Sequence, residues 1–527
     1  MARVTTKKRL SIANAATLLI ASALLGQVLG LFRTRLVNAN FPATGPGSTD
    51  AYFAAFNIPD FFFFTLAAGA LGVAFMPVLA ERLHKGDKRG MWDISTSLLN
   101  LLMAVMFVVG LIIFIFAQPL VHYIISPNLT PTQLHNTVTI MRYLAFNPLL
   151  FTISGVLTAV QQTLGRFFFY ALAPLIYNFC IIVSIYVFRH NVGLTGLGLG
   201  ALVGAILQLA VIMLGLFGTN FHWNPKILWR SSDFRTILRQ LPPRSLDQGI
   251  DQVESIVETH FARRLGSGYI SYYNNAYTMS TAPALLIGTA ISTAAFPQLN
   301  NRLAQGRPDL YRKEFLQVVR FMVWLAMPVV VLCYFTRGYL ARLIYANNAP
   351  EIALIFGALA LSIFFTTLYT IISRWFYSHK DTRTPLFVSI FTIFFDIVLV
   401  SFLARPSTYG VSGLAITQSI VAMVEVIILS VIMLIRDHKL FDISFWASIG
   451  RIISVTGFSM VTGYIMVSLF PLEAADRGIV TLGSKLALIV GVTMLVHIGV
   501  SSLFELSEVK PIFSRVRKLL NISRPIY

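Results

Sequence analysis

Charged residues and cysteine are both scarce in this chain of 527 residues. Only 12% of the residues are charged and 56% are hydrophobic, which excludes an ordinary soluble protein. The two cysteines, Cys180 and Cys333, both fall in apolar stretches, so we expect neither a disulfide framework nor a thiolate metal site. The chain also lacks a phosphate-binding loop of the G-x-x-x-x-G-K-[ST] type and any polar segment long enough for a nucleotide-binding domain. ATP hydrolysis is therefore excluded, and we expect no catalytic residues.

Apolar stretches long enough to cross a bilayer recur along almost the whole chain. About 20 helical residues cross a hydrocarbon core roughly 30 Å thick. The sequence therefore predicts an all-α polytopic membrane protein with about fourteen transmembrane helices. The predicted spans are 11–36, 52–80, 93–117, 134–161, 168–189, 195–218, 236–262, 270–299, 314–336, 350–378, 385–404, 409–435, 447–470 and 481–504.

Basic residues outnumber acidic ones by 41 to 22, an excess that could by itself suggest binding to nucleic acid. They lie instead in alternate loops between the predicted spans, among them 82–89 and 302–313. This alternation is the positive-inside pattern of membrane proteins. We therefore expect no nucleic-acid partner and place both termini in the cytoplasm. Arg263 and Arg264 are the clearest exceptions to the pattern.

Two segments far apart in the sequence are similar. "AFMPVLAERLHKGD" at 74–87 and "AAFPQLNNRLAQGR" at 294–307 share Pro, Leu, Arg, Leu and Gly at a single offset of 220 residues. Such a repeat predicts two pseudo-symmetric six-helix lobes with a substrate site between them, followed by a C-terminal helix pair. The predicted divisions are 1–225 for the first lobe, 226–440 for the second lobe, and 441–527 for the last two helices and a basic tail.

Carboxylates gather on one face of the predicted helix at 236–262. The four are Asp247, Asp251, Glu254 and Glu258. At about 100° per residue they fall within an arc of about 60°, with Arg244 one turn earlier. Because such a face cannot contact lipid stably, we expect it to line a hydrated cavity that binds cations or a substrate amine. The alternative is an ion-paired face that joins helices through Arg33, Arg35 or Arg244.

Other charges also fall within or at the ends of predicted spans, where they are costly and mark candidate sites. Asp60 lies in the span at 52–80, and Asp396 lies in the middle of the span at 385–404. We expect Asp396 to mark an ion site. Arg33 and Arg35 end the first span, where they either bind an anion or extend to the membrane interface.

Several segments resemble the hallmark segments of the MurJ (MviN) family, the lipid II flippases of the MOP exporter superfamily. They are "VLGLFRTRLVNANF" at 28–41, "DAYFAAFNIPDFFFFTLAAGALGVAFMPVLAE" at 50–81 and "WFYSHKDTRTPL" at 375–386. The resemblance implies the same helix count and lobes, with a central cavity that opens alternately to either side of the bacterial cytoplasmic (inner) membrane. It also implies a groove near the last two helices for a polyprenyl tail. The implied substrate is a lipid-linked disaccharide-peptide, and the expected partners are membrane lipid and proteins of cell-wall synthesis.

The resemblance also implies which residues bind the substrate. Arg33 and Asp50 match family cavity positions, whereas Gln27, Phe63 and Thr278 stand where the family has arginine. Arginine suits a pyrophosphate because its paired donors match the anion. The candidate substrate-binding residues are Arg33, Arg35, Asp50, Asp60, Arg244, Asp251, Glu254 and Thr278.

Sodium is the one cofactor that the resemblance suggests. By alignment with the family, Glu258 and Asp396 fall on ligand positions in helices 7 and 11, and Thr417 supplies a hydroxyl from helix 12. Three oxygen donors of this kind suit a hard cation.

Three functions remain open at this point. The hallmark segments favour a flippase of the MurJ type that works by alternating access. The acidic face and the missing arginines favour a MATE-like, cation-coupled exporter of cationic compounds. A third interpretation is a membrane scaffold for cell-wall assembly that does not transport. The most useful single observation is whether the chain restores growth to cells depleted of their own lipid II flippase.

Overall fold

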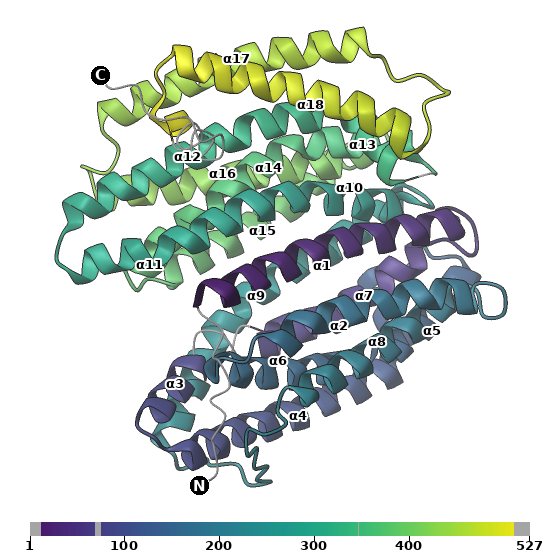
Figure 1. Ribbon diagram of the computed structural model, residues 1–527. Helices are drawn as coiled ribbons and strands as arrows, with labels where there is room; N and C mark the ends of the chain where they lie inside the picture. The colour runs from purple at the N-terminus through teal and green to yellow at the C-terminus, as the bar shows by residue number, and fades with distance from the viewer. Residues whose placement is uncertain (1–11, 69–74, 346, 511–527) are drawn as a thin grey trace, which may run out of the picture. The chain divides into compact units, whose positions relative to one another are not determined.

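The computed structural model describes residues 12–68, 75–345 and 347–510, and in that part every regular element is a helix (Figure 1). By internal contacts the chain divides into two compact units, Met1–Ser271 and Tyr272–Tyr527. The first unit holds α1 (Ile12–Asn40), α2 (Asp50–Phe63), α3 (Met76–His84), α4 (Lys88–Pro119), α5 (Pro131–Leu144), α6 (Asn147–Thr163), α7 (Phe168–Phe188), α8 (Thr195–Leu214) and α9 (Ser232–Leu265).

Helix α10 (Tyr269–Ala284) crosses the border between the units. The second unit continues with α11 (Ala290–Ala304), α12 (Pro308–Phe335), α13 (Arg337–Ile344), α14 (Ala349–Ser378), α15 (Arg383–Leu403), α16 (Val411–Arg436), α17 (Ile443–Leu469) and α18 (Gly478–Leu503). Packing therefore groups α9 with the helices before it, whereas the repeat placed residues 226–440 in one lobe. The division into 1–225, 226–440 and 441–527 stays a prediction.

Eleven helices in the described residues are long and apolar enough to cross a membrane. They correspond to eleven of the predicted spans, so the all-α polytopic class is confirmed, but the count of about fourteen is not. The predicted spans at 11–36 and 52–80 each include residues outside the described part. The span at 236–262 forms α9, whose composition is too polar to meet the same criterion.

The sequence repeat is also a repeat of backbone conformation. After α3, the amide of Gly86 donates to the carbonyl of Leu83 (3.1 Å), and that of Asp87 donates to Arg82 (3.0 Å). Both bonds recur 220 residues later after α11, at 3.0 and 3.1 Å. Gly86 has φ 77° and Gly306 has φ 67°, as this helix-ending motif requires. A π-helix precedes each copy, η1 (Phe64–Ala68) and η4 (Leu285–Thr289).

Each unit has its own apolar core. In the first, Leu79, Leu98 and Phe234 are fully enclosed where α3, α4 and α9 meet. In the second, Trp324 of α12 and Phe376 of α14 are likewise enclosed.

Buried polar contacts join the last two helices to α12. Helices α17 and α18 run side by side (Figure 1), and a hydrogen bond of 2.8 Å links Ser459 of α17 to His497 of α18. The indole N–H of Trp324 donates to Ser501 of α18 at 2.8 Å. Since all four side chains are buried, these bonds specify how the helix pair packs on α12.

Candidate transport site

The acidic face of α9 becomes more enclosed along the helix. Asp251 is exposed, Glu254 is half-buried, and Glu258 is only 7% exposed. The adjoining face packs on α2, where the amide of Asn57 donates to Thr259 (2.7 Å) and Ser255 donates to Asn57 (3.2 Å). Asp251 is therefore outside this contact, whereas Glu258 is enclosed next to it. The side chains of Arg244 and Asp247 lie outside the described residues.

Arg33 belongs to a polar group inside the first unit. Its charge acts on the carboxylate of Asp60 and the phenol of Tyr52, both on α2, and on the phenol of Tyr177 on α7. Arg33, Asp60 and Arg35 are each half-buried. The sequence offered no signal for the two tyrosines, because aromatic residues are common throughout the chain.

Asp50 is fully buried at the start of α2. One carboxylate oxygen accepts from the amide of Gly268 (2.6 Å), and the other accepts from the amide (2.9 Å) and hydroxyl (2.8 Å) of Ser271. Arg263 lies 3.8 Å from the same carboxylate. These bonds fasten the start of α2 to the turn between α9 and α10. A contact between Asp50 and a substrate would require them to break.

Arg263 extends this network to α5. Its guanidinium donates to the Gln133 side chain (2.7 Å) and to the carbonyl of Asn128 (3.1 Å), and only 7% of its surface is exposed. The Gln133 amide donates in turn to the carbonyl of Gly45 (2.9 Å) and to Ser48 (3.1 Å). The exception that Arg263 makes to the basic-loop pattern thus has a cause, because this arginine is a buried cross-link and not a loop charge.

The hallmark segment at 381–385 builds the start of α15. The Asp381 carboxylate accepts from the amides of Arg383 (2.9 Å) and Thr384 (3.0 Å), from the Thr384 hydroxyl (2.6 Å) and from Arg436 (2.6 Å). Partial burial alone would raise the pKa of Asp381, but the bonds from Thr384, Arg436 and Arg383 lower it to about 2. The motif therefore serves structure, since it joins the ends of α14, α15 and α16.

The candidate cation ligands in the second unit lie on two helices that pack together, α15 and α16. Asp396 is 2% exposed, and its Oδ2 has no hydrogen-bond partner among the described residues. Thr417 is fully buried and donates to the carbonyl of Gly413 (2.8 Å), which leaves its oxygen able to accept. An orphaned carboxylate oxygen and a hydroxyl fit a hard cation. Within the described residues, no three His, Cys, Asp or Glu side chains gather as a metal site.

Thr278, on α10, is half-buried, and its hydroxyl donates to the carbonyl of Asn274 one turn earlier (2.8 Å). A substrate contact by Thr278 therefore stays a prediction.

An almost wholly apolar cavity of about 480 Å³ lies in the second unit among α12, α14, α16 and α17. Phe364 and Phe365 of α14, Val431 of α16 and Trp446 of α17 line it, and Ser430 contributes a hydroxyl. A cavity of this composition suits a hydrocarbon chain.

Comparisons with known proteins agree with one another. The family model described as lipid II flippase MurJ matches residues 45–475. A probable lipid II flippase MurJ of Borreliella burgdorferi is 22% identical over 429 residues, which are 80% of this chain and 83% of that relative.

A solved lipid II flippase MurJ in an inward closed conformation has a TM-score of 0.77 at 20% identity, with 93% of this chain and 98% of that chain covered. An inward-facing MATE multidrug transporter of the MOP superfamily has a TM-score of 0.65 at 17% identity, with 81% and 98% covered. At these identities the two structural matches show a shared fold.

Proposed function

This chain belongs to the lipid II flippase MurJ family, and from that premise we propose that it moves a lipid-linked disaccharide-peptide across the cytoplasmic membrane by alternating access. The match of the family model over residues 45–475 carries the proposal. The chain is a multi-pass membrane protein, which suits an amphiphilic cargo that must cross the bilayer. Membrane lipid surrounds it, and proteins of cell-wall synthesis are the partners that this role suggests.

We assign the substrate's pyrophosphate to Arg33, with Arg35 as its neighbour on α1. Asp60, Tyr52 and Tyr177 support the assignment, because these polar groups of the first unit lie within the field of the Arg33 charge. A pyrophosphate would bind Arg33 through bidentate hydrogen bonds. The apolar cavity that Phe364 and Trp446 line is the proposed resting place of the polyprenyl chain.

A test of the flippase function uses Arg33→Lys, which keeps the charge but removes the paired donors. In cells depleted of their own lipid II flippase, we expect the wild type to restore growth. Arg33→Lys should transport at least roughly tenfold more slowly, the equivalent of about 1.4 kcal/mol of lost interaction. Arg89→Lys is the matched control, because Arg89 is exposed at the start of α4. A wild-type chain that expresses and fails to restore growth would contradict the function, whereas unchanged transport by Arg33→Lys would contradict only the assignment to Arg33.

We also propose that Asp396 and Thr417 hold a sodium ion, while Glu258 of the first unit stays a predicted ligand. Sodium would then stabilise the purified protein against heat more than the same concentration of choline, and Asp396→Asn would remove the difference. Ser401→Ala is the control, because Ser401 lies near the end of the same helix and its hydroxyl donates to the carbonyl of Val398 (2.7 Å). A sodium response that persists in Asp396→Asn would exclude Asp396 as a ligand.

A second candidate function is export of cationic compounds. The exposed Asp251 and half-buried Glu254 favour it, since exposed carboxylates attract cations. The variant Asp251→Asn discriminates the two candidates. An exporter should confer resistance to a cationic dye and lose it in Asp251→Asn, whereas a flippase should confer no such resistance in either form.

A further inference from the structure

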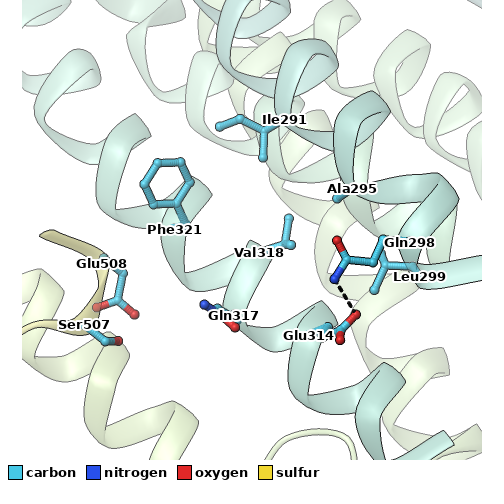
Figure 2. Close-up of a pocket in the computed structure, with 10 residues that line it drawn as sticks. All are labelled: Ile291, Ala295, Gln298, Leu299, Glu314, Gln317, Val318, Phe321, Ser507 and Glu508. Carbon is cyan, nitrogen blue, oxygen red and sulfur yellow. Dashed lines mark hydrogen bonds between the residues drawn. The ribbon is translucent and has the colours of Figure 1, made fainter. Parts of the chain in front are cut away.

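A second cavity in the second unit has a different character from the apolar one. It measures about 460 Å³ and lies among α11, α12 and the short helix η5 (Ser507–Val509) (Figure 2). Apolar side chains such as Val318 and Phe321 form part of its wall. Exposed polar side chains stand at its edge, namely Gln298, Gln317 and Ser507. The cavity therefore has an opening that water or a polar head group can reach.

The cavity contains a buried carboxylate that lacks hydrogen bonds. The Glu508 side chain is only 2% exposed, and neither of its oxygens has a hydrogen-bond partner among the described residues. Its ionic neighbour in that part of the chain is Arg320 of α12, whose Nε lies 3.3 Å from Oε1 in a geometry that makes no hydrogen bond. Figure 2 shows the carboxylate beside Ser507, on the side of the cavity where Gln317 also lies. A buried polar group without a partner costs about 1–3 kcal/mol, and more when it is charged.

The other carboxylate of the cavity is already satisfied. Glu314 accepts from Arg302 (2.8 Å) and from the amide of Gln298 (3.1 Å), so it has less need of a ligand. Glu508 is therefore the carboxylate that lacks hydrogen bonds, and it lines the cavity together with the Ser507 hydroxyl and the Gln317 amide. An ammonium group matches it, because it is a compact cation with three donors and no acceptor.

We propose that this cavity binds a primary ammonium group carried by an amphiphilic molecule. The ammonium donates to Glu508 and Ser507, the Gln317 amide contacts the atoms next to it, and the apolar part lies along Val318 and Phe321. The head group of phosphatidylethanolamine has this chemistry and is available at the position of α12, which is apolar enough to span the membrane. Soluble amines share the chemistry and form the other possible source. A quaternary ammonium has no N–H to donate, so a choline head group should bind more weakly.

The test compares lipids that differ only in the head group. The full-length protein, purified in detergent, is titrated with phosphatidylethanolamine or phosphatidylcholine of the same acyl chains while its thermal midpoint is followed. We expect binding of phosphatidylethanolamine to be at least roughly tenfold tighter, as the loss of a charged hydrogen bond implies. Ethanolamine in solution is the third arm. A shift with the lipid alone assigns the site to a membrane head group, and an equal shift with ethanolamine assigns it to soluble amines.

Variants test whether the preference for phosphatidylethanolamine depends on this cavity. Glu508→Gln should abolish the preference for the primary amine, whereas Glu505→Gln, at an exposed carboxylate of the same segment, should keep it. Ala295→Leu fills part of the cavity and leaves the Arg320–Glu508 pair unchanged. It is therefore the variant to test if Glu508→Gln does not fold. Equal binding of the two lipids by the wild type would overturn the proposal. So would a preference for phosphatidylethanolamine that survives both cavity variants.

Discussion

The two copies of the repeat end a helix with the same backbone turn, yet they attach that turn to different partners. In the first copy, Arg82 pairs with Asp87 (2.7 Å) and with Asp233 of α9 (2.8 Å). In the second, Arg302 pairs with Glu314 of α12 (2.8 Å). The two copies therefore share the backbone conformation of the turn, but the side chains around the turn contact different helices. The first copy joins α3 to α9, and the second forms the edge of the cavity that contains Glu508.

The residue that follows the glycine of the turn also differs between the two copies. Asp87 accepts from the amide of Gly90 (2.8 Å) and so caps α4. This bond, together with Arg82, holds the pKa of Asp87 below its ordinary value. Arg307 occupies the equivalent place before α12 and makes no side-chain cap. The start of α12 has Pro308 instead, whose fixed φ suits the first turn of a helix.

The π-helices before the two turns are also packed differently. In the first copy, Thr65 of η1 faces Gly249 of α9, and a Cβ at Gly249 would lie 2.2 Å from its hydroxyl and 2.9 Å from its Cβ. In the second copy, Gly288 of η4 faces Thr370 of α14, where the nearest atom would be the hydroxyl at 2.9 Å. The first contact is tighter, and rotating the Thr65 side chain cannot move its Cβ.

The largest expected effect comes from filling these two contacts. Gly249→Ala should destabilise the protein by about 1–3 kcal/mol, as overpacking does, and Gly288→Ala should cost less, because its nearest contact is 2.9 Å rather than 2.2 Å. Thermal midpoints in one detergent measure the difference. Gly450→Ala is the control, since Gly450 lies in α17 with open space around it and alanine favours a helix. A larger loss at Gly288 than at Gly249 would contradict the difference in packing.

The sequence predicted the features that depend on local pattern. Apolar runs predicted eleven helices that the structure contains. The similarity of 74–87 and 294–307 predicted a repeat, and its two copies form the same hydrogen bonds at the turn. Features that depend on distant partners could not be predicted. Arg263 looked like a misplaced loop charge because its partners Asp50 and Gln133 are far away in sequence. Glu508 gave no signal at all, since the packing of η5 on α12 and α18 buries it.

The smallest expected effect is a gain, obtained by giving the second copy the cap of the first. Asp87 has φ −82° and ψ 71°, and Arg307 has φ −114° and ψ 71°, so the backbone before α12 already suits a capping side chain. Arg307→Asp should stabilise the protein by about 0.5–1 kcal/mol at neutral pH, because its carboxylate can accept from the amide of Leu310. Arg307→Asn keeps the acceptor without the charge and so separates capping from electrostatics.

The pH dependence of that gain has a definite sign. A capping carboxylate has a lower pKa in the folded state than in the unfolded state, as Asp87 does. Its contribution is therefore present above the unfolded pKa of about 3.9 and is lost as the pH falls through the folded pKa. The gain from Arg307→Asp should disappear on acidification, whereas that from Arg307→Asn should not, and thermal midpoints at pH 7 and at about pH 3 measure both. If neither variant is more stable than the wild type at pH 7, the residue after the glycine cannot be exchanged between the two copies. The structural similarity of the copies would then extend only as far as Gly86 and Gly306.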